Sequence, residues 1–201
     1  MKKILILFEY NIKNGGAQKS IIEIIKNNTE DNKFYSLMPL YGDYSSYLNE
    51  LGVETYYGGS KEYWPGKENI LKFLLNLFQV IKKSKKIIKE NKIDTVYCTM
   101  LPSLLVGVAN KLLFFKNIKI VWHDRVTENS KVFILIFKLI SKRIDTIITT
   151  TPYGYNKIAG YGYNKEKLYM IPNSTDFCNE NISYVKKINH DNLKIALIGR
   201  I

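Results

Sequence analysis

Short apolar runs and longer amphipathic stretches alternate along the chain. Several runs are continuously apolar, as in strands that are covered on both faces of a sheet. We expect strands at Lys3–Phe8, Phe34–Leu40, Val53–Tyr57, Thr95–Thr99, Lys119–His123, Asp145–Thr150 and Leu168–Ile171. We expect helices at Ala17–Asn27, Ser45–Leu51, Glu68–Asn91, Pro102–Phe114, Lys131–Arg143 and Pro152–Ala159. This alternation is typical of βαβ units, so the pattern predicts an α/β fold with a parallel sheet and helices on both faces.

The periodic pattern ends before the chain does. Residues 178–192 are polar and show no periodicity, whereas Leu193–Ile201 again has the pattern of a strand, here followed by glycine and arginine. We therefore expect one domain at 1–177, a linker at 178–192 and, at 193–201, the first strand of a truncated second domain. The composition, 46% hydrophobic and 24% charged in 201 residues, is that of a globular protein with a sizeable core.

The net charge of +12 is concentrated in the middle of the chain, since residues 51–150 carry 17 basic and 8 acidic side chains. Basic charge beside apolar stripes favours an anionic membrane surface as a partner. In the long predicted helix, a second apolar face is followed by a lysine cluster that we expect to face the membrane: Lys82, Lys83, Lys85 and Lys86. Packing of that face against neighbouring helices, with the lysines simply solvated, remains the alternative. A recognition helix or stacking motif is missing, so we expect no nucleic acid partner.

Cys98 and Cys178 are too few and too isolated for a disulfide framework or a zinc site. The chain begins like a signal peptide, but Glu9 ends the apolar run after five residues. The longest apolar run, Val132–Phe137, is far shorter than a membrane span. We expect a cytoplasmic protein, with peripheral attachment to the inner face of the cell membrane as an open possibility.

The first candidate site is the pair Gly15 and Gly16, between the first strand and the first helix. Two glycines let the backbone approach a ligand closely, and a helix start offers N–H groups and a positive dipole end to an anion. The spacing does not fit the G-x-G-x-x-G dinucleotide fingerprint, so a nicotinamide cofactor is not expected. A tight turn without a ligand remains the alternative.

The second candidate is His123, at the end of a predicted strand and followed by Asp124 and Arg125. Strand ends at this edge of a parallel sheet face the ligand cleft. A metal centre is not expected, because His190 is the only other histidine and the chain contains no Asp-x-Asp pair.

Two further candidates lie near the end of the chain. Asn173 and Asp176 belong to a Pro-Asn-Ser-Thr-Asp turn after the last strand, which is also explained as an exit loop. Arg200 follows the final strand, where its planar fork would suit a diphosphate.

These motifs, in this order, resemble glycosyltransferase family 4, whose retaining enzymes have the two-domain GT-B architecture. The resemblance rests on Gly15-Gly-Ala17 before a helix, the histidine at a strand end, Ile171-Pro-Asn-Ser-Thr-Asp176 and Ile198-Gly-Arg-Ile201, together with the strand sequences at 51–56, 92–97 and 143–148. Ser174 stands where the family usually has glycine, and Thr175 where valine is common. The resemblance spans the whole chain and implies that this is the Rossmann-like, acceptor-side half of the fold.

The resemblance implies a metal-independent transfer of sugar from a nucleotide-sugar donor to a polysaccharide or lipid-linked acceptor, with no cofactor. Gly15, Gly16 and Arg200 would bind the donor diphosphate, His123 would contact the donor sugar near the reacting centre, and Asn173 and Asp176 would line the hinge and cleft. We expect a chain that ends at Ile201 to be inactive by itself. A non-catalytic acceptor- or membrane-binding subunit, working with a separate donor-domain chain, is the alternative.

Overall fold

The computed structural model of the chain describes residues 1–9, 16–58, 70–125 and 130–173. Its centre is a parallel sheet of seven strands in the order β3-β2-β1-β4-β5-β6-β7. The strands are β1 (Lys2–Leu7), β2 (Asn32–Met38), β3 (Glu54–Tyr57), β4 (Thr95–Cys98), β5 (Lys119–Asp124), β6 (Thr146–Thr149) and β7 (Leu168–Met170). All seven predicted strands are confirmed, with ends that differ by at most two residues.

The helices are α1 (Gly16–Lys26), α2 (Asp43–Glu50), α3 (Ile70–Asn91), α4 (Leu101–Leu113), α5 (Lys131–Ile140) and α6 (Pro152–Gly160). Two 3-10 turns, η1 (Ser141–Arg143) and η2 (Lys165–Lys167), precede β6 and β7. The six predicted helices are confirmed, although the predicted start of the third, Glu68, lies outside the described residues. One prediction was too long: α5 ends at Ile140 and tightens into η1, which delivers Ile144 to the core before β6.

Local chemistry explains where helices begin. Ser130 caps α5 by accepting a hydrogen bond from the Phe133 N–H at 3.1 Å, and Thr151 caps α6 by accepting one from Gly154. Pro152 follows the second cap, at the position where a missing N–H costs nothing.

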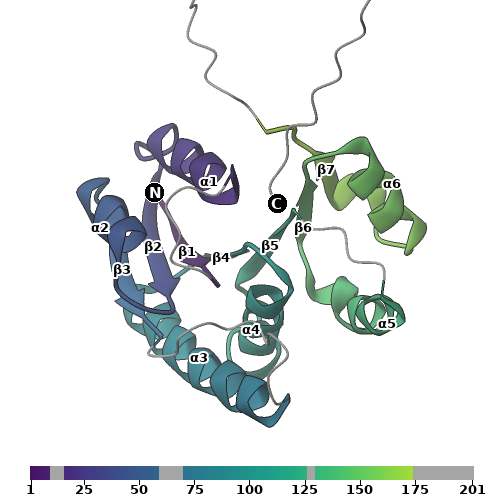
Figure 1. The fold of residues 1–201 in the computed structure, drawn as a ribbon, viewed down its shortest axis with the longest axis horizontal. Coiled ribbons are helices and arrows are strands. Elements are labelled where there is room, and N and C mark those ends of the chain that lie inside the picture. The colour runs from purple at the N-terminus through teal and green to yellow at the C-terminus, as the bar shows by residue number, and fades with distance from the viewer. Residues whose placement is uncertain (10–15, 59–69, 126–129, 174–201) are drawn as a thin grey trace, which may run out of the picture.

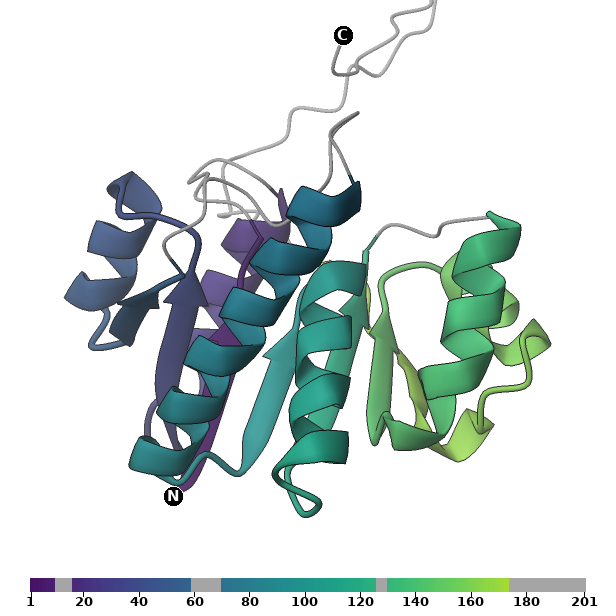
Figure 2. The ribbon, with the colours of Figure 1, turned by 90° about the horizontal axis from the view of Figure 1, so that it is seen from below.

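Helices cover both faces of the sheet (Figure 1). The buried side chains form two separate cores, one on each face. On one face, α1 and α2 pack over β1 and β2 through residues such as Ile25, Tyr44 and Phe34. The other face carries α3, α4 and α5, which lie in front of the sheet in Figure 2. The prediction of helices on both faces is confirmed.

Gly107 sets the distance between α4 and the sheet. A Cβ atom at this position would lie 2.9 Å from the Cys98 Sγ and 3.4 Å from a methyl of Ile120. Real side chains do not approach so closely, so glycine lets α4 press onto β4 and β5 over a fully buried thiol.

The strand order fixes where a ligand would bind. The chain runs outward from β1 to β3 on one side and from β4 to β7 on the other, so the direction of winding reverses between β1 and β4. In open parallel sheets, ligands bind outside the carboxyl ends of the strands at such a reversal. Glu9, Thr99 and His123 all lie at that edge.

Candidate functional site at the carboxyl edge of the sheet

The most informative side chain at this edge is His123, near the end of β5. It is only 4% exposed, and its Nδ1 lies 2.5 Å from the Tyr97 hydroxyl and 3.1 Å from the Arg125 Nη2. Tyr97 comes from the adjacent strand β4, and the two rings meet edge to face. His123 is therefore held from two sides at one nitrogen.

Arg125 connects this histidine to the first helix. Its Nη2 also donates a hydrogen bond of 2.6 Å to the Ser20 hydroxyl of α1. Burial lowers the pKa of Arg125 from its ordinary value, while the nearby Tyr97 and Tyr44 hydroxyls oppose that shift. Arg125 remains a cation under ordinary conditions, because an arginine starts from a pKa far above neutrality. The site thus ties β4, β5 and α1 together around a half-buried positive charge.

Burial lowers the pKa of His123 to about 3, and the positive charge of Arg125 adds to the effect. The imidazole is therefore neutral near pH 7. Burial also raises the pKa of Tyr97 to about 12, which keeps the hydroxyl protonated. Among described residues, the buried His123 Nε2 and Arg125 Nε have no hydrogen-bond partner. Buried polar atoms are normally paired, so two unpaired nitrogens in one cluster indicate a site for a ligand.

A second buried ionisable group, Glu9, lies directly after β1 and was not predicted from the sequence as functional. Its carboxyl group accepts a hydrogen bond from the Ser103 N–H at 3.0 Å and contacts the Thr99 hydroxyl, which in turn lies 2.9 Å from the Leu7 carbonyl oxygen. Burial raises the pKa of Glu9, an effect that outweighs these hydrogen bonds. Glu9 therefore joins the end of β1 to the start of α4.

The predicted anion site is described only in part. Gly16 is the first residue of α1 and is exposed; apart from its chain neighbours and its own helix, no described residue comes within 4 Å of the place where a Cβ would stand. The first-turn N–H groups of α1 have no partner inside the helix. Gly15, Asp176 and Arg200 lie outside the described residues. Asn173 is exposed just beyond β7, where the Ile171 N–H still bonds to the Thr149 carbonyl.

The predicted membrane-facing lysines lie on α3, in the second half of the helix. Lys82 and Lys86 are exposed, and Lys86 pairs with Glu90 at 3.8 Å. The Lys85 Nζ lies 3.8 Å from the centre of the Phe114 ring, and Lys83 donates to the Tyr57 carbonyl. No helix within the described ranges is long and apolar enough to cross a bilayer.

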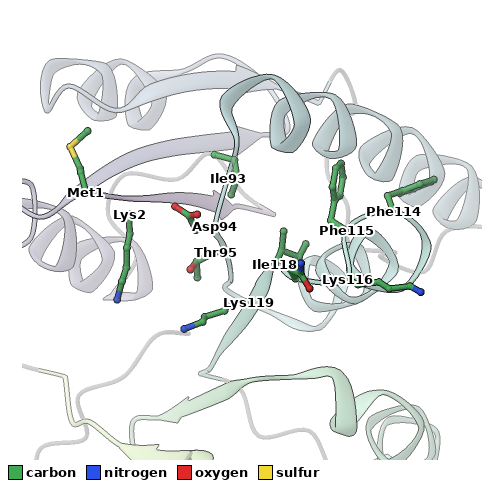
Figure 3. A pocket seen from close by; sticks show the side chains of 11 residues that line it. Met1, Lys2, Ile93, Asp94, Thr95, Phe114, Phe115, Lys116, Ile118 and Lys119 are labelled. Atoms are coloured by element: carbon green, nitrogen blue, oxygen red, sulfur yellow. The ribbon is translucent and has the colours of Figure 1, made fainter.

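A hollow of about 690 Å³ lies at the opposite edge of the sheet, beside the amino ends of β1, β4 and β5. Figure 3 shows Lys116 pointing away from Lys2 and Lys119, so these cations do not converge on one point. The Asp94 carboxylate already accepts from the Lys3 N–H at 2.8 Å. We therefore assign the candidate site to the carboxyl edge. In the described part of the chain, no group of three or more His, Cys, Asp or Glu side chains is placed to hold a metal ion.

With these features in place, the fold defines the class: the chain is a Rossmann-like α/β unit matching one half of a GT-B glycosyltransferase. Residues 45–177 match the model of Glycosyltransferase Family 4. Because this match covers more than half of the 201 residues, the chain belongs to that family. The resemblance seen in the sequence motifs is confirmed.

Solved structures share the fold at low sequence identity. Anabaena HepE, crystallised with UDP and glucose, is 16% identical with a TM-score of 0.62, over 88% of this chain and 45% of HepE. A glycosyltransferase from Rickettsia africae is 16% identical with a TM-score of 0.64, over 85% of this chain and 42% of its own. A UDP-N-acetylglucosamine 2-epimerase from Rickettsia bellii is also 16% identical, with a TM-score of 0.58, over 86% and 45%. The chain thus spans less than half the length of these proteins. No curated protein sequence matches it.

Proposed function

We propose that the chain provides the acceptor-side half of a glycosyltransferase that moves a sugar from a nucleotide-sugar donor to a glycan or lipid-linked acceptor. The observation that carries this proposal is the buried Nε2 of His123 at the carboxyl edge, which has no partner among the described residues, in a chain that belongs to family 4. The family membership matters because the fold alone is shared with an epimerase.

In this mechanism His123 is a hydrogen-bonding residue rather than a general base. Its low pKa leaves the ring neutral, and Nε2 contacts the donor sugar near the reacting carbon. The N–H groups at Gly15 and Gly16, together with Arg200, stabilise the negative charge that develops on the leaving nucleoside diphosphate. Positive charge from the helix dipole and the arginine takes the role that a divalent cation has in other transferases, so we expect transfer to persist in EDTA.

The test measures binding and transfer with UDP-glucose as the first donor, because HepE was crystallised with UDP and glucose. It uses the 201-residue chain and any longer product of the same reading frame. We expect His123→Ala and Arg200→Ala each to lower donor turnover by about tenfold or more. His190→Ala and Arg143→Ala are matched controls, since they remove the other histidine and an exposed arginine.

Unchanged turnover in both site variants would contradict the assignment of His123 and Arg200. If no chain length binds or transfers any nucleotide-sugar, the non-catalytic subunit becomes the better explanation. In that case, the reading frame after codon 201 should be followed by a separate gene for a donor-binding domain.

We also propose that α3 docks on an anionic membrane. Its solvent-facing stripe is apolar in the second and third turns, where Leu74, Leu75 and Phe78 are 52%, 56% and 67% exposed. Helical spacing continues the same stripe through Lys82, Lys85, Lys86 and Lys89. Apolar side chains followed by lysines match the surface of a bilayer that contains anionic lipids, which suits a lipid-linked acceptor.

Vesicle sedimentation tests this docking. Binding should rise with the fraction of phosphatidylglycerol and fall with salt, because the attraction is partly electrostatic. Phe78→Ser with Leu74→Ser, or Lys82→Glu with Lys86→Glu, should abolish most of it, whereas Lys165→Glu with Lys167→Glu should not. Binding that ignores both lipid charge and salt would contradict the proposal and favour a protein partner for the stripe.

A further inference from the structure

We propose that Arg125 and Tyr97 are positioning residues that hold His123 in the Nε2–H tautomer, so that the ring presents a hydrogen-bond donor to an oxygen atom of the ligand. Only the identity of that ligand rests on the proposed function. The tautomer itself is a property of the chain without any ligand.

The argument begins with Arg125, whose guanidinium has only donor hydrogens and no lone pair to offer. Its Nη2 lies 3.1 Å from the His123 Nδ1, which is hydrogen-bond distance. If Nδ1 carried a proton, two N–H groups would face each other in a buried site. The contact is attractive only when Nδ1 is bare and accepts from Arg125.

Tyr97 supports the same assignment from the other side. Its hydroxyl lies 2.5 Å from Nδ1 and is protonated, so it can donate to the bare nitrogen. The same hydroxyl interacts favourably with the Arg125 guanidinium, whose pKa it raises. Each of the three groups then has a consistent role, with Nδ1 as the shared acceptor.

A neutral imidazole has one ring proton, so a bare Nδ1 places that proton on Nε2. Nε2 is buried and has no partner among the described residues. The Arg125 Nε, a second donor of the same cluster, is also buried and has no partner among the described residues. Two N–H groups require lone pairs opposite them, which a sugar hydroxyl, a carbonyl or a phosphate oxygen supplies. A ligand cation or ammonium group does not fit.

Ser20 keeps Arg125 in place, because its hydroxyl accepts from the same Nη2 at 2.6 Å. Ser20 lies on α1, one turn after the helix start at Gly16. The arginine that sets the tautomer is therefore anchored on the helix whose first turn is the proposed diphosphate site.

Long-range ¹H–¹⁵N NMR of the histidine ring distinguishes the two tautomers directly, since a protonated and a bare ring nitrogen resonate far apart. The chain has only two histidines, so a His190→Gln background leaves His123 as the single signal. We expect a protonated Nε2 and a bare Nδ1 at pH 7. A protonated Nδ1, or an imidazolium, would overturn the proposal.

The positioning role is tested by Arg125→Met combined with Tyr97→Phe, which removes both donors and keeps most of the volume. We expect the two tautomers to interconvert in this variant, so that the ring nitrogen shifts are averaged. The methyl signals of the core residues should keep the dispersion of a folded protein. Arg125→Lys restores one donor and should partly restore the Nε2–H form. An unchanged tautomer in the folded double variant would contradict the roles of Arg125 and Tyr97.

Ligand binding separates this inference from the proposed function. If the chain binds UDP-glucose, the double variant should weaken binding by about tenfold, the effect of losing one well-placed hydrogen bond. If wild type binds no nucleotide-sugar yet shows the Nε2–H tautomer, the proposed function fails and the tautomer assignment stands.

Discussion

Two strands on either side of β4 end at the carboxyl edge in a buried ionisable side chain, Glu9 after β1 and His123 in β5. Glu9 is 2% exposed and His123 is 4% exposed, so both are removed from water. They differ in their partners. Both carboxyl oxygens of Glu9 have hydrogen-bond partners, Thr99 and the Ser103 N–H. His123 uses one nitrogen and leaves the other unpaired among described residues.

The difference separates a structural group from a candidate binding group. A buried polar group with all its hydrogen bonds made stabilises the fold and has nothing left to offer a ligand. A buried ring with one unpaired N–H is incomplete until something binds. Perturbed pKa values occur at both strand ends, so the pKa shift alone does not tell the two roles apart.

The largest expected effect on stability comes from removing Glu9, the buried group whose two carboxyl oxygens both have hydrogen-bond partners. Glu9→Ala removes the acceptor for the Ser103 N–H and leaves a cavity, so it should lower the free energy of unfolding by about 3 kcal/mol. Urea denaturation at pH 7 measures this loss. Glu9→Gln is the matched control, because its amide can accept from Ser103 and donate to Thr99, and it should cost less than about 1 kcal/mol.

The difference in stability between Glu9→Ala and Glu9→Gln also reports whether Glu9 is protonated. The one proton of the Thr99 hydroxyl has two acceptors within reach, the Leu7 carbonyl oxygen at 2.9 Å and a Glu9 carboxyl oxygen. If the hydroxyl donates to Leu7, the contact with Glu9 needs the proton of a neutral carboxyl group, the form that a raised pKa favours. If glutamine proves as damaging as alanine, Glu9 is a carboxylate and this description of the strand end is wrong.

The next effect concerns pH at His123. Its folded pKa of about 3 lies below the ordinary 6.5, so below about pH 6.5 the unfolded chain gains a proton that the folded chain refuses. Stability should therefore fall with acidification, by about 2 kcal/mol between pH 7.5 and pH 5. Comparing the wild type with His123→Gln at both pH values isolates this contribution, and an equal response of the two would contradict the buried, neutral ring.

Glu9 should respond to pH with the opposite sign. Its folded pKa is raised above the value of 4.5, so its contribution is complete below that value and is lost as pH rises through the folded pKa. The wild type should therefore lose stability relative to Glu9→Gln on going from acid toward neutral pH. A difference that stays constant across this range would show that the carboxyl group does not titrate in the folded chain.

The smallest effect on stability should come from replacing His123, whose Nε2 has no partner among the described residues. His123→Gln at pH 7.5 keeps an oxygen that can accept from Tyr97 and Arg125, so the free energy of unfolding should change by less than about 1 kcal/mol. The same measurement on Tyr97→Phe provides a comparison, since it removes the hydroxyl partner of Nδ1 and leaves the imidazole in place. A loss as large as that of Glu9→Ala would make His123 a structural residue first.

The fold was accessible from the sequence because burial on both faces gives apolar runs such as Lys3–Phe8 and Lys119–His123. The sequence identifies His123 by its position, as a polar residue at a predicted strand end. The same pattern identifies Glu9 only as the end of an apolar run and Tyr97 only as part of a strand. Their roles depend on which strands are neighbours: β4 lies between β1 and β5, which brings Thr99 to Glu9 and Tyr97 to His123. Strand order is not contained in local periodicity.

Arg125 was the one partner with a local signal, two residues after His123 in the printed sequence. Arg125 directly follows the end of β5, and residues at that position lie at the cleft. Its place in the sequence was therefore enough to predict a role at the site. Its contact with Ser20, 105 residues away, required the placement of α1 over the sheet.

The close approach of α4 to β4 at Gly107 has an experimental consequence. The Cys98 sulfur beneath it is fully buried, and burial raises the pKa of its thiol well above the ordinary value. An alkylating reagent therefore reacts only after α4 has separated from the sheet, and the reaction rate reports how often that happens. In a Cys178→Ser background, mass spectrometry of one sulfur atom would measure that opening under native conditions, without denaturant.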